Sequence, residues 1–246
     1  MKNSSKYLLA ALLVLLASLT AYNMALRNEY RRGDYKDPLH GYVTLGFKDF
    51  TEVSVPAASV VSVKLVPGPF SVRLNPAATQ YVHLRQQGSR LVITADFPDR
   101  QHYFGGPATV LISCPHLAAL STDAVHQEKG RQLIGKNYRA DRYILAQDVV
   151  VQGFSQDSLT VRVDRGSRIE LAGNKLGYLR ATAGTSPGSH GLLQLNADNH
   201  IAAANFAVGH QSELVLDNIL IPQLRHQLAD SVKVTLTGAS LGSLAQ

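Results

Sequence analysis

The sequence predicts an all-β protein, a parallel β-helix or β-solenoid, preceded by an N-terminal single transmembrane helix. Apolar and polar residues alternate with a period of two through most of the chain after residue 42, as in "VVSVKLV" and "RLVITADF". Turn residues separate these runs, and nineteen Gly, ten Pro and only five Glu in 246 residues are typical of a β protein. A repeat of roughly twenty residues in the second half favours a solenoid.

The N-terminal segment, residues 1–26, predicts a membrane anchor or signal-anchor. Residues 7–26, "YLLAALLVLLASLTAYNMAL", carry no charge, and as a helix they span about 30 Å, the thickness of a bilayer core. A cleaved signal peptide is the alternative, but the small residues it needs before the cleavage site are poorly met. We therefore expect residues 7–26 to stay in the membrane.

Residues 27–42 are polar and turn-rich, with Gly33, Pro38 and Gly41, and predict a juxtamembrane linker. Basic residues flank both ends of the apolar segment, so charge alone leaves its orientation nearly undecided. We expect residues 43–246 to form an exported domain because of the character of that domain.

A repeat organises the second half. Four stretches, "SRIELAG", "GLLQLNA", "SELVLDN" and "VKVTLTG", place leucines at positions 171, 195, 216 and 236, at intervals of 24, 21 and 20 residues. Between them "LGYLRATAG" and "IAAANFAVG" align without a gap. The alignment predicts two inward sets, Leu179, Ala181, Ala183 and Ala204, Phe206, Val208, and an outward set, Tyr178, Arg180, Thr182. We interpret the repeat as a stacked coil with three short strands per turn, and a plain β-sandwich is the alternative.

The chain also resembles a known family. The stretches "FKDFTEVSVPAASVVSVKLVPGPFSVRL", "RLVITADF" and above all "VLISCPHLAALSTDAV" are similar to the auto-transporter adhesin head domain (head GIN domain) of bacterial envelope proteins. The resemblance runs from about Phe47 to the C-terminus and implies a β-helical fold, an adhesive or surface role, and no catalytic residues. The corners lack the family's Ser-Gly-Ser-Gly repeats, and residues 126–147 are more charged than such a coil.

Charge and cysteine content exclude several classes. The net charge of +6 is spread among acids, and no RNA-binding signature or recognition helix accompanies it, so we expect no nucleic-acid partner. A lone cysteine, Cys114, excludes an internal disulfide framework and a cysteine-based zinc site, and in "VLISC" it predicts a buried thiol. Gly184, Ser186 and Gly188 spell G-x-S-x-G, but Pro187 and a strand follow where a nucleophile elbow needs a helix. We interpret this stretch as a corner insertion.

Histidines are the only candidate metal ligands. His190, His200 and His210 lie ten residues apart, and two of them on adjacent rungs are able to share a metal. No third ligand stands at a suitable position, so we interpret them as solvated loop residues and expect no metal and no cofactor. His226 falls at an inward position, where it is either a buried, hydrogen-bonded side chain or a sign that the register slips at Pro222.

The expected function is non-catalytic. Carbohydrate-cleaving enzymes need paired carboxylates, and the outward row we assign has few acids: Arg162, Glu170, Arg180, Gln194, Lys233. We expect a single-pass cell-envelope protein with an adhesive or surface-binding role toward a glycan or a cell-surface protein. Tyr178, Arg180 and Thr182 are the candidate binding residues, because an exposed ring beside a guanidinium and a hydroxyl suits stacking on a sugar. The alternatives are a structural or signalling envelope component without an external ligand, and a β-helical polysaccharide-active enzyme.

Overall fold

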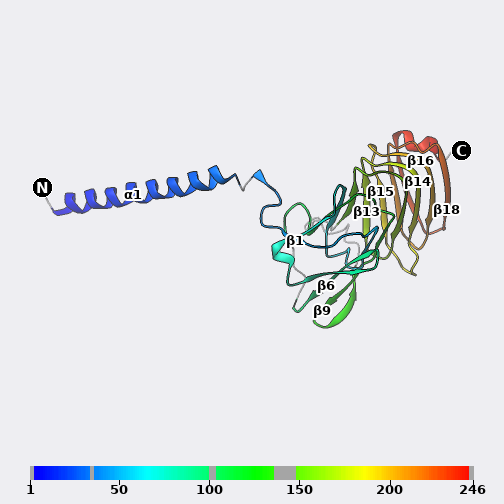
Figure 1. Ribbon diagram of the computed structural model, residues 1–246, viewed down its shortest axis with the longest axis horizontal. Helices are drawn as coiled ribbons and strands as arrows, with labels where there is room; N and C mark the ends of the chain where they lie inside the picture. Colours follow the sequence, from blue (N-terminus) through cyan, green and yellow to red (C-terminus); the bar gives the residue numbers. More distant parts are fainter. Residues whose placement is uncertain (1–2, 34–35, 100–103, 136–147, 244–246) are drawn as a thin grey trace. The chain divides into compact units, whose positions relative to one another are not determined.

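The computed structural model describes residues 3–33, 36–99, 104–135 and 148–243 (Figure 1). The chain divides into two compact units, Met1–Gly41 and Tyr42–Gln246. The finer division into residues 1–26, 27–42 and 43–246 stays a prediction.

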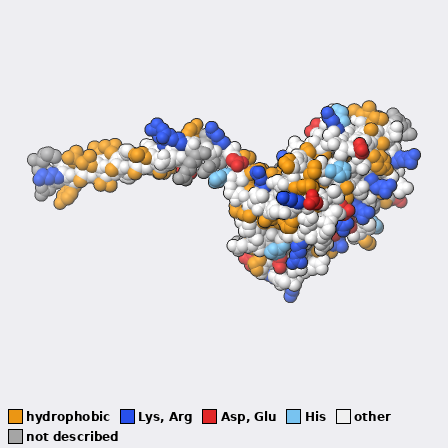
Figure 2. All heavy atoms as spheres, in the orientation of Figure 1, with side chains coloured by type: hydrophobic (Ala, Val, Ile, Leu, Met, Phe, Trp, Pro, Cys, Tyr) orange, Lys and Arg blue, Asp and Glu red, His pale blue; other side chains and the backbone are white. Residues whose placement is uncertain are grey.

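The first unit contains one long helix, α1 (Asn3–Arg32). Its described side chains are almost all exposed, and apolar groups cover much of its length (Figure 2). The hydroxyl of Thr20 donates to the Leu16 carbonyl at 2.8 Å, which satisfies a polar group inside the apolar stretch. By length and composition Ser4–Arg31 is able to cross a membrane, and a signal sequence meets the same criteria. The predicted N-terminal apolar helix is thus present.

The second unit is built from two large sheets. From one edge of sheet 1 to the other, the described strands are β1 (Val43–Leu45), β4 (Ser71–Leu74), β7 (Val110–Cys114), β3 (Val63–Pro67), β11 (Val149–Gln152), β13 (Arg168–Ala172), β15 (Leu192–Leu195), β17 (Glu213–Asp217) and β19 (Lys233–Thr237). Across sheet 2 they are β10 (Arg131–Ile134), β9 (Val125–Glu128), β6 (Arg90–Phe97), β2 (Glu52–Val55), β8 (Ala119–Thr122), β12 (Ser155–Val163), β14 (Lys175–Ala183), β16 (His200–Val208) and β18 (Gln223–Leu228), with β5 (Val82–Gln87) paired to β6. The described residues of this unit also form the short 3-10 helices η2 (Pro76–Ala78) and η3 (Gly238–Ser243).

The predicted parallel β-helix or β-solenoid is wrong. Both sheets are mixed, because β1–β4, β4–β7, β5–β6 and β9–β10 pair antiparallel. Gly88 and the pair Lys129–Gly130 have positive φ, which is the backbone that tight hairpin turns require, and they close the β5–β6 and β9–β10 hairpins. Each repeat also contributes two strands, one to each sheet, where we predicted three. The result is a pair of mixed sheets and no closed coil.

The predicted register of the repeat is nevertheless confirmed within the parallel part. The repeated leucines pair in series across sheet 1, as Leu171↔Leu195, Leu195↔Leu216 and Leu216↔Leu236. In sheet 2 the two aligned stretches pair as Leu179↔Ala204, Ala181↔Phe206 and Ala183↔Val208. All six of these sheet 2 residues are buried. Period-two alternation and the aligned glycines therefore located the inner face correctly.

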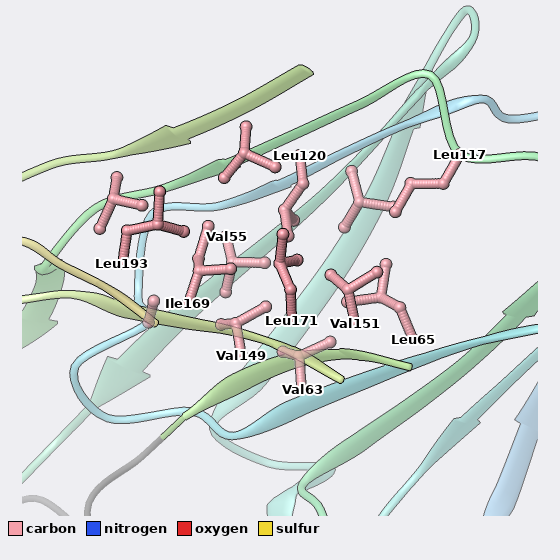
Figure 3. Close-up of a cluster of buried hydrophobic side chains, with 14 of the residues drawn as sticks. Val55, Val63, Leu65, Leu117, Leu120, Val149, Val151, Ile169, Leu171 and Leu193 are labelled. Atoms are coloured by element: carbon pink, nitrogen blue, oxygen red, sulfur yellow. The ribbon is translucent and has the colours of Figure 1, made fainter. Parts of the chain in front are cut away.

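One apolar core fills the space between the sheets (Figure 3). Val63, Val149 and Ile169 approach it from sheet 1, and Val55 and Leu120 from sheet 2. Full burial of an aliphatic side chain of this kind contributes about 1.5–3 kcal/mol, so the alternating residues supply the main stabilising term. Cys114 is fully buried in the same core, as predicted, and burial raises the pKa of its thiol to about 11.

Polar side chains stack at the corners between strands. Asn174 is fully buried, and its side chain accepts from the Phe154 N–H at 3.0 Å and donates to the Val151 carbonyl at 3.0 Å and to Asn199 Oδ1 at 2.9 Å. Asn199 in turn donates to the Leu171 carbonyl at 2.7 Å. Backbone groups that the turns leave unpaired are satisfied in this way, as buried polar groups must be.

Among the described residues, β18 and β19 are the last strands of their sheets. His226 pairs in register with Phe206, yet it is exposed because no described strand covers β18 on its outer side. The register therefore does not slip at Pro222, and His226 is not a buried histidine.

Candidate functional site

The predicted residues Tyr178, Arg180 and Thr182 lie together on β14, on the face of sheet 2 that points away from the core. Arg180 is exposed, and Tyr178 and Thr182 are half-buried. The residues between them, Leu179 and Ala181, are buried. The structure thus places the three side chains in one short column, at alternate positions of a strand.

A break in the strand pairing precedes Tyr178. The register skips Gly177 between Leu176 and Tyr178, and both Gly177 and Tyr178 point outward. A Cβ on Gly177 would lie 2.8 Å from the Asp157 carbonyl oxygen, so glycine is required for this approach of two backbones. Small residues, Ser158 and Ala203, pair with Tyr178 on either side.

Neighbouring strands add two further arginines to this face. Arg162 pairs with Thr182 from β12, and Arg225 of β18 follows Asn205 in the row that contains Arg180. Both guanidinium groups belong to exposed residues. We call the outward residues of β12, β14, β16 and β18 around Arg162, Arg180 and Arg225 the arginine face.

The arginine face carries charge that its own side chains do not neutralise. Among the described residues, no ion pair or side-chain hydrogen bond engages the guanidinium group of Arg162, Arg180 or Arg225. Asp157 is the only acidic residue of the four strands, and it lies at the break in pairing, three residues before the row of Arg180. The next acid toward the centre of sheet 2, Glu52, accepts from Arg90 at 2.9 and 2.7 Å.

Several charges on the outer face of sheet 1 are paired with one another. Arg168 lies 3.4 Å from Asp148, 4.0 Å from Glu170, and donates to Gln194 at 2.8 Å. Lys233 pairs with Glu213 at 3.1 Å. Burial raises the pKa of Asp148, while Arg168 opposes this effect and Glu170 adds to it. Arg168 and Lys233 on this face are therefore paired within the protein, whereas Lys64 and Arg73 on the same sheet form no ion pair with the residues that the structure describes.

This comparison corrects the outward row assigned from the sequence. Arg162 and Arg180 lie on sheet 2, whereas Glu170, Gln194 and Lys233 lie on sheet 1, on the opposite side of the core. The error follows from counting three strands per repeat, because that count merges the outward positions of both sheets into one row. Arg225 was left out of the outward row, although the inward position assigned to His226 places Arg225 outward, beside Asn205.

The serine and histidine motifs singled out in the sequence do not form a site among the described residues. Ser186 of the G-x-S-x-G stretch lies in a corner between β14 and β15, and its hydroxyl donates to Asp164 Oδ2 at 2.6 Å. Burial alone raises the pKa of Asp164, but hydrogen bonds from Ser186, Arg165 and Ser189 outweigh burial and lower it. Within the part of the chain that the structure describes, no three His, Cys, Asp or Glu residues gather as metal ligands would.

Two hollows adjoin the arginine face. One of about 260 Å³ is lined by Arg90, Ser121, Thr160 and Arg162, where the small residues of β8 lower the surface between two arginines. Another of about 920 Å³ follows the corner that includes Asp157, Lys175 and His200. The first hollow extends from Arg162 toward Arg90, whose guanidinium is paired with Glu52, and Glu52 also lines the hollow.

No family model matches the chain, and no curated protein matches it either. Membership of the head GIN domain family therefore stays a prediction. Similar solved structures include a "putative adhesin" from Bacteroides fragilis, with a TM-score of 0.47 and 10% identity over 82% of this chain and 95% of that one. A putative adhesin from Parabacteroides distasonis has a TM-score of 0.34 and 11% identity over 80% of this chain and 94% of that one. Another from Parabacteroides merdae has a TM-score of 0.33 and 10% identity over 80% of this chain and 95% of that one. At these scores and identities the similarities do not define a function for this chain.

Proposed function

We propose that this chain is a non-catalytic protein of the cell envelope that binds a surface through the arginine face, with Tyr178, Arg180 and Thr182 at its centre. In this proposal α1 is retained as a single-pass membrane anchor, and residues 43–246 form the exported binding domain. The observation that carries the binding role is an exposed, unpaired Arg180 beside a half-buried ring with small neighbours.

The chemistry of the arginine face supports binding more than catalysis. Acid–base catalysis of glycoside cleavage needs two carboxyl groups near one another, and the four strands contain a single acid, Asp157. Arginine forks, hydroxyls and one ring are typical of recognition surfaces, in which aromatic and arginine side chains contribute much of the affinity. The expected partner is a glycan or a cell-surface protein.

The anchor is tested by N-terminal sequencing of the mature protein from membrane fractions. Retention of residues 7–26 supports the proposal, and a mature chain that begins near Tyr22 or Arg27 contradicts it.

Binding is tested with the full chain in lipid nanodiscs, immobilised and exposed to isolated bacterial envelope material. Tyr178→Ala and Arg180→Gln are compared with the wild type and with Lys64→Gln and Lys233→Gln, which remove charge from sheet 1. We expect the first pair alone to weaken binding. Equal binding by all variants contradicts the proposed role of the arginine face and favours an envelope component without an external ligand.

A further inference from the structure

We propose that the ligand of the arginine face is an anionic polysaccharide, whose carboxylate, sulfate or phosphate groups are bound by Arg162, Arg180 and Arg225. This inference rests on the proposed function and names the class of partner. It depends on the spacing of the three arginines, on their lack of acidic partners, and on the neutral groups between them.

The spacing follows from the strand register. Arg180 and Arg225 occupy one row and are two strands apart, a separation of roughly 10 Å at about 4.8 Å per strand. Arg162 lies on the other side of Arg180, one strand away and one outward position further along. The charges therefore form a strip that runs across the strands, which suits an extended chain with charges at intervals better than a single small anion.

Arginine is suited to this task. Its planar guanidinium binds carboxylate, sulfate or phosphate oxygens with two parallel hydrogen bonds, and it remains charged at every pH relevant to a cell surface. Since Arg162, Arg180 and Arg225 have no acidic partner among the described residues, an incoming anion displaces no internal ion pair. On sheet 1, by contrast, a ligand of Arg168 or Lys233 would have to compete with Asp148, Glu170 and Glu213.

The groups between the arginines are neutral hydrogen-bonding side chains. Arg180 pairs with Thr160 on one side and with Asn205 on the other, and Gln223 and Gln227 flank Arg225 on β18. Hydroxyl and amide groups match the hydroxyls of a sugar. Tyr178, with Ser158 and Ala203 beside it, offers one ring for the face of a pyranose.

A nucleic acid fits the same surface less well. Single-stranded nucleic acids are held by several aromatic side chains on which successive bases stack. Along the outward positions of β12, β14, β16 and β18 that the structure describes, Tyr178 is the only aromatic ring of the Phe, Tyr or Trp type. No described helix of Tyr42–Gln246 is long enough to read a major groove.

The test measures binding of the full chain in nanodiscs to four purified polymers of matched length: polygalacturonate, a sulfated glycan, a teichoic-type polyphosphate and neutral dextran, with duplex DNA as a fifth probe. Arg162→Gln, Arg180→Gln and Arg225→Gln are made singly and together. Lys64→Gln, Arg131→Gln and Lys233→Gln together remove the same charge elsewhere. Circular dichroism and melting temperature establish that each variant is folded.

We expect binding to at least one anionic polysaccharide, little binding to dextran, and an affinity that falls as NaCl concentration rises. Each single change should weaken binding about two- to fivefold and the triple change about 10- to 100-fold, because exposed charge pairs are individually weak. The control triple variant should bind within about twofold of the wild type, because its charges lie away from the arginine face. The polymer that binds identifies whether carboxylate, sulfate or phosphate is preferred.

Several results would overturn the inference. If the control triple variant loses as much affinity as the arginine triple variant, binding depends only on net charge, and the three arginines are not a specific binding site. Preference for duplex DNA, with the same arginine dependence, would replace the polysaccharide by a nucleic acid. If Arg180→Gln abolishes binding to envelope material while no anionic polysaccharide binds or competes, the ligand class is wrong and the proposed function stands. If neither envelope material nor any polymer binding depends on the arginine face, both proposals fail.

Discussion

Replacing Asn174 by alanine tests how the corners hold the repeats together. The Asn174 side chain is buried and makes three hydrogen bonds, with the Phe154 N–H, the Val151 carbonyl and Asn199 Oδ1. Alanine leaves the Phe154 N–H and the Val151 carbonyl without these partners. A buried polar group that loses its partner costs about 1–3 kcal/mol, so two of them predict a loss of about 2–6 kcal/mol.

Urea unfolding of the purified chain, followed by circular dichroism, measures this loss as a change in the free energy of unfolding. Asn205→Ala is the matched control: Asn205 lies on β16 with its side chain on the outer face, half-buried, and its change should stay within about 0.5 kcal/mol. In a double-mutant cycle with Asn199→Ala, the direct 2.9 Å bond predicts a coupling of about 1 kcal/mol. A loss at Asn174 no larger than that at Asn205 would refute the view that stacked asparagines satisfy the corners.

Three further predictions concern the core, the corners and the cysteine. Phe206→Asp should unfold the domain, because it places an unpaired carboxylate at a fully buried position, while Tyr178→Ala should shift the melting temperature little. The reverse pattern in thermal melts would show that the assigned strand register is off by one residue. The pKa of Asp164 is lowered in the folded state, so its carboxylate stabilises the fold above its unfolded pKa of about 3.9, and this stabilisation is lost as pH falls through the folded pKa. The difference in free energy of unfolding between wild type and Asp164→Asn should therefore shrink from pH 7 to pH 3. A difference that stays constant or grows contradicts this prediction. The buried Cys114 thiol, with a pKa of about 11, should react with a disulfide reagent far more slowly in the native protein than in urea, and equal rates would show that the core around it is open.

Local patterning in the sequence was sufficient to predict the inner face of the parallel strands but not the architecture. Phe206 was placed in the core and Tyr178 outside because a strand alternates its faces, and that rule depends only on neighbouring residues. The number of strands per turn depends instead on how far the chain runs before it folds back. After β17, for example, Ile219 and Ile221 are buried in a corner and form no third strand, and the next strand begins at Gln223.

The sequence repeat does not extend to the antiparallel strands, so their pairing could not be predicted from it. The hairpins at Gly88 and at Lys129–Gly130 have recognisable turn residues, but nothing in the sequence tells which distant strand each hairpin joins. The sequence did place Arg162 and Arg180 in one outward row, but it mixed them with residues of sheet 1. Arg225 lies 45 positions from Arg180 in sequence, and the pairing through Asn205 places it in the row of Arg180.

Arginine footprinting tests the central claim most directly, because it reports on the proposed surface residue by residue. The full chain in nanodiscs is treated with phenylglyoxal, alone and after saturation with envelope material, and modified peptides are quantified by mass spectrometry. Binding at the arginine face predicts that Arg162, Arg180 and Arg225 are protected by the envelope material while Arg131 reacts at an unchanged rate. Envelope material that binds and leaves Arg180 as reactive as in the free chain would contradict the account.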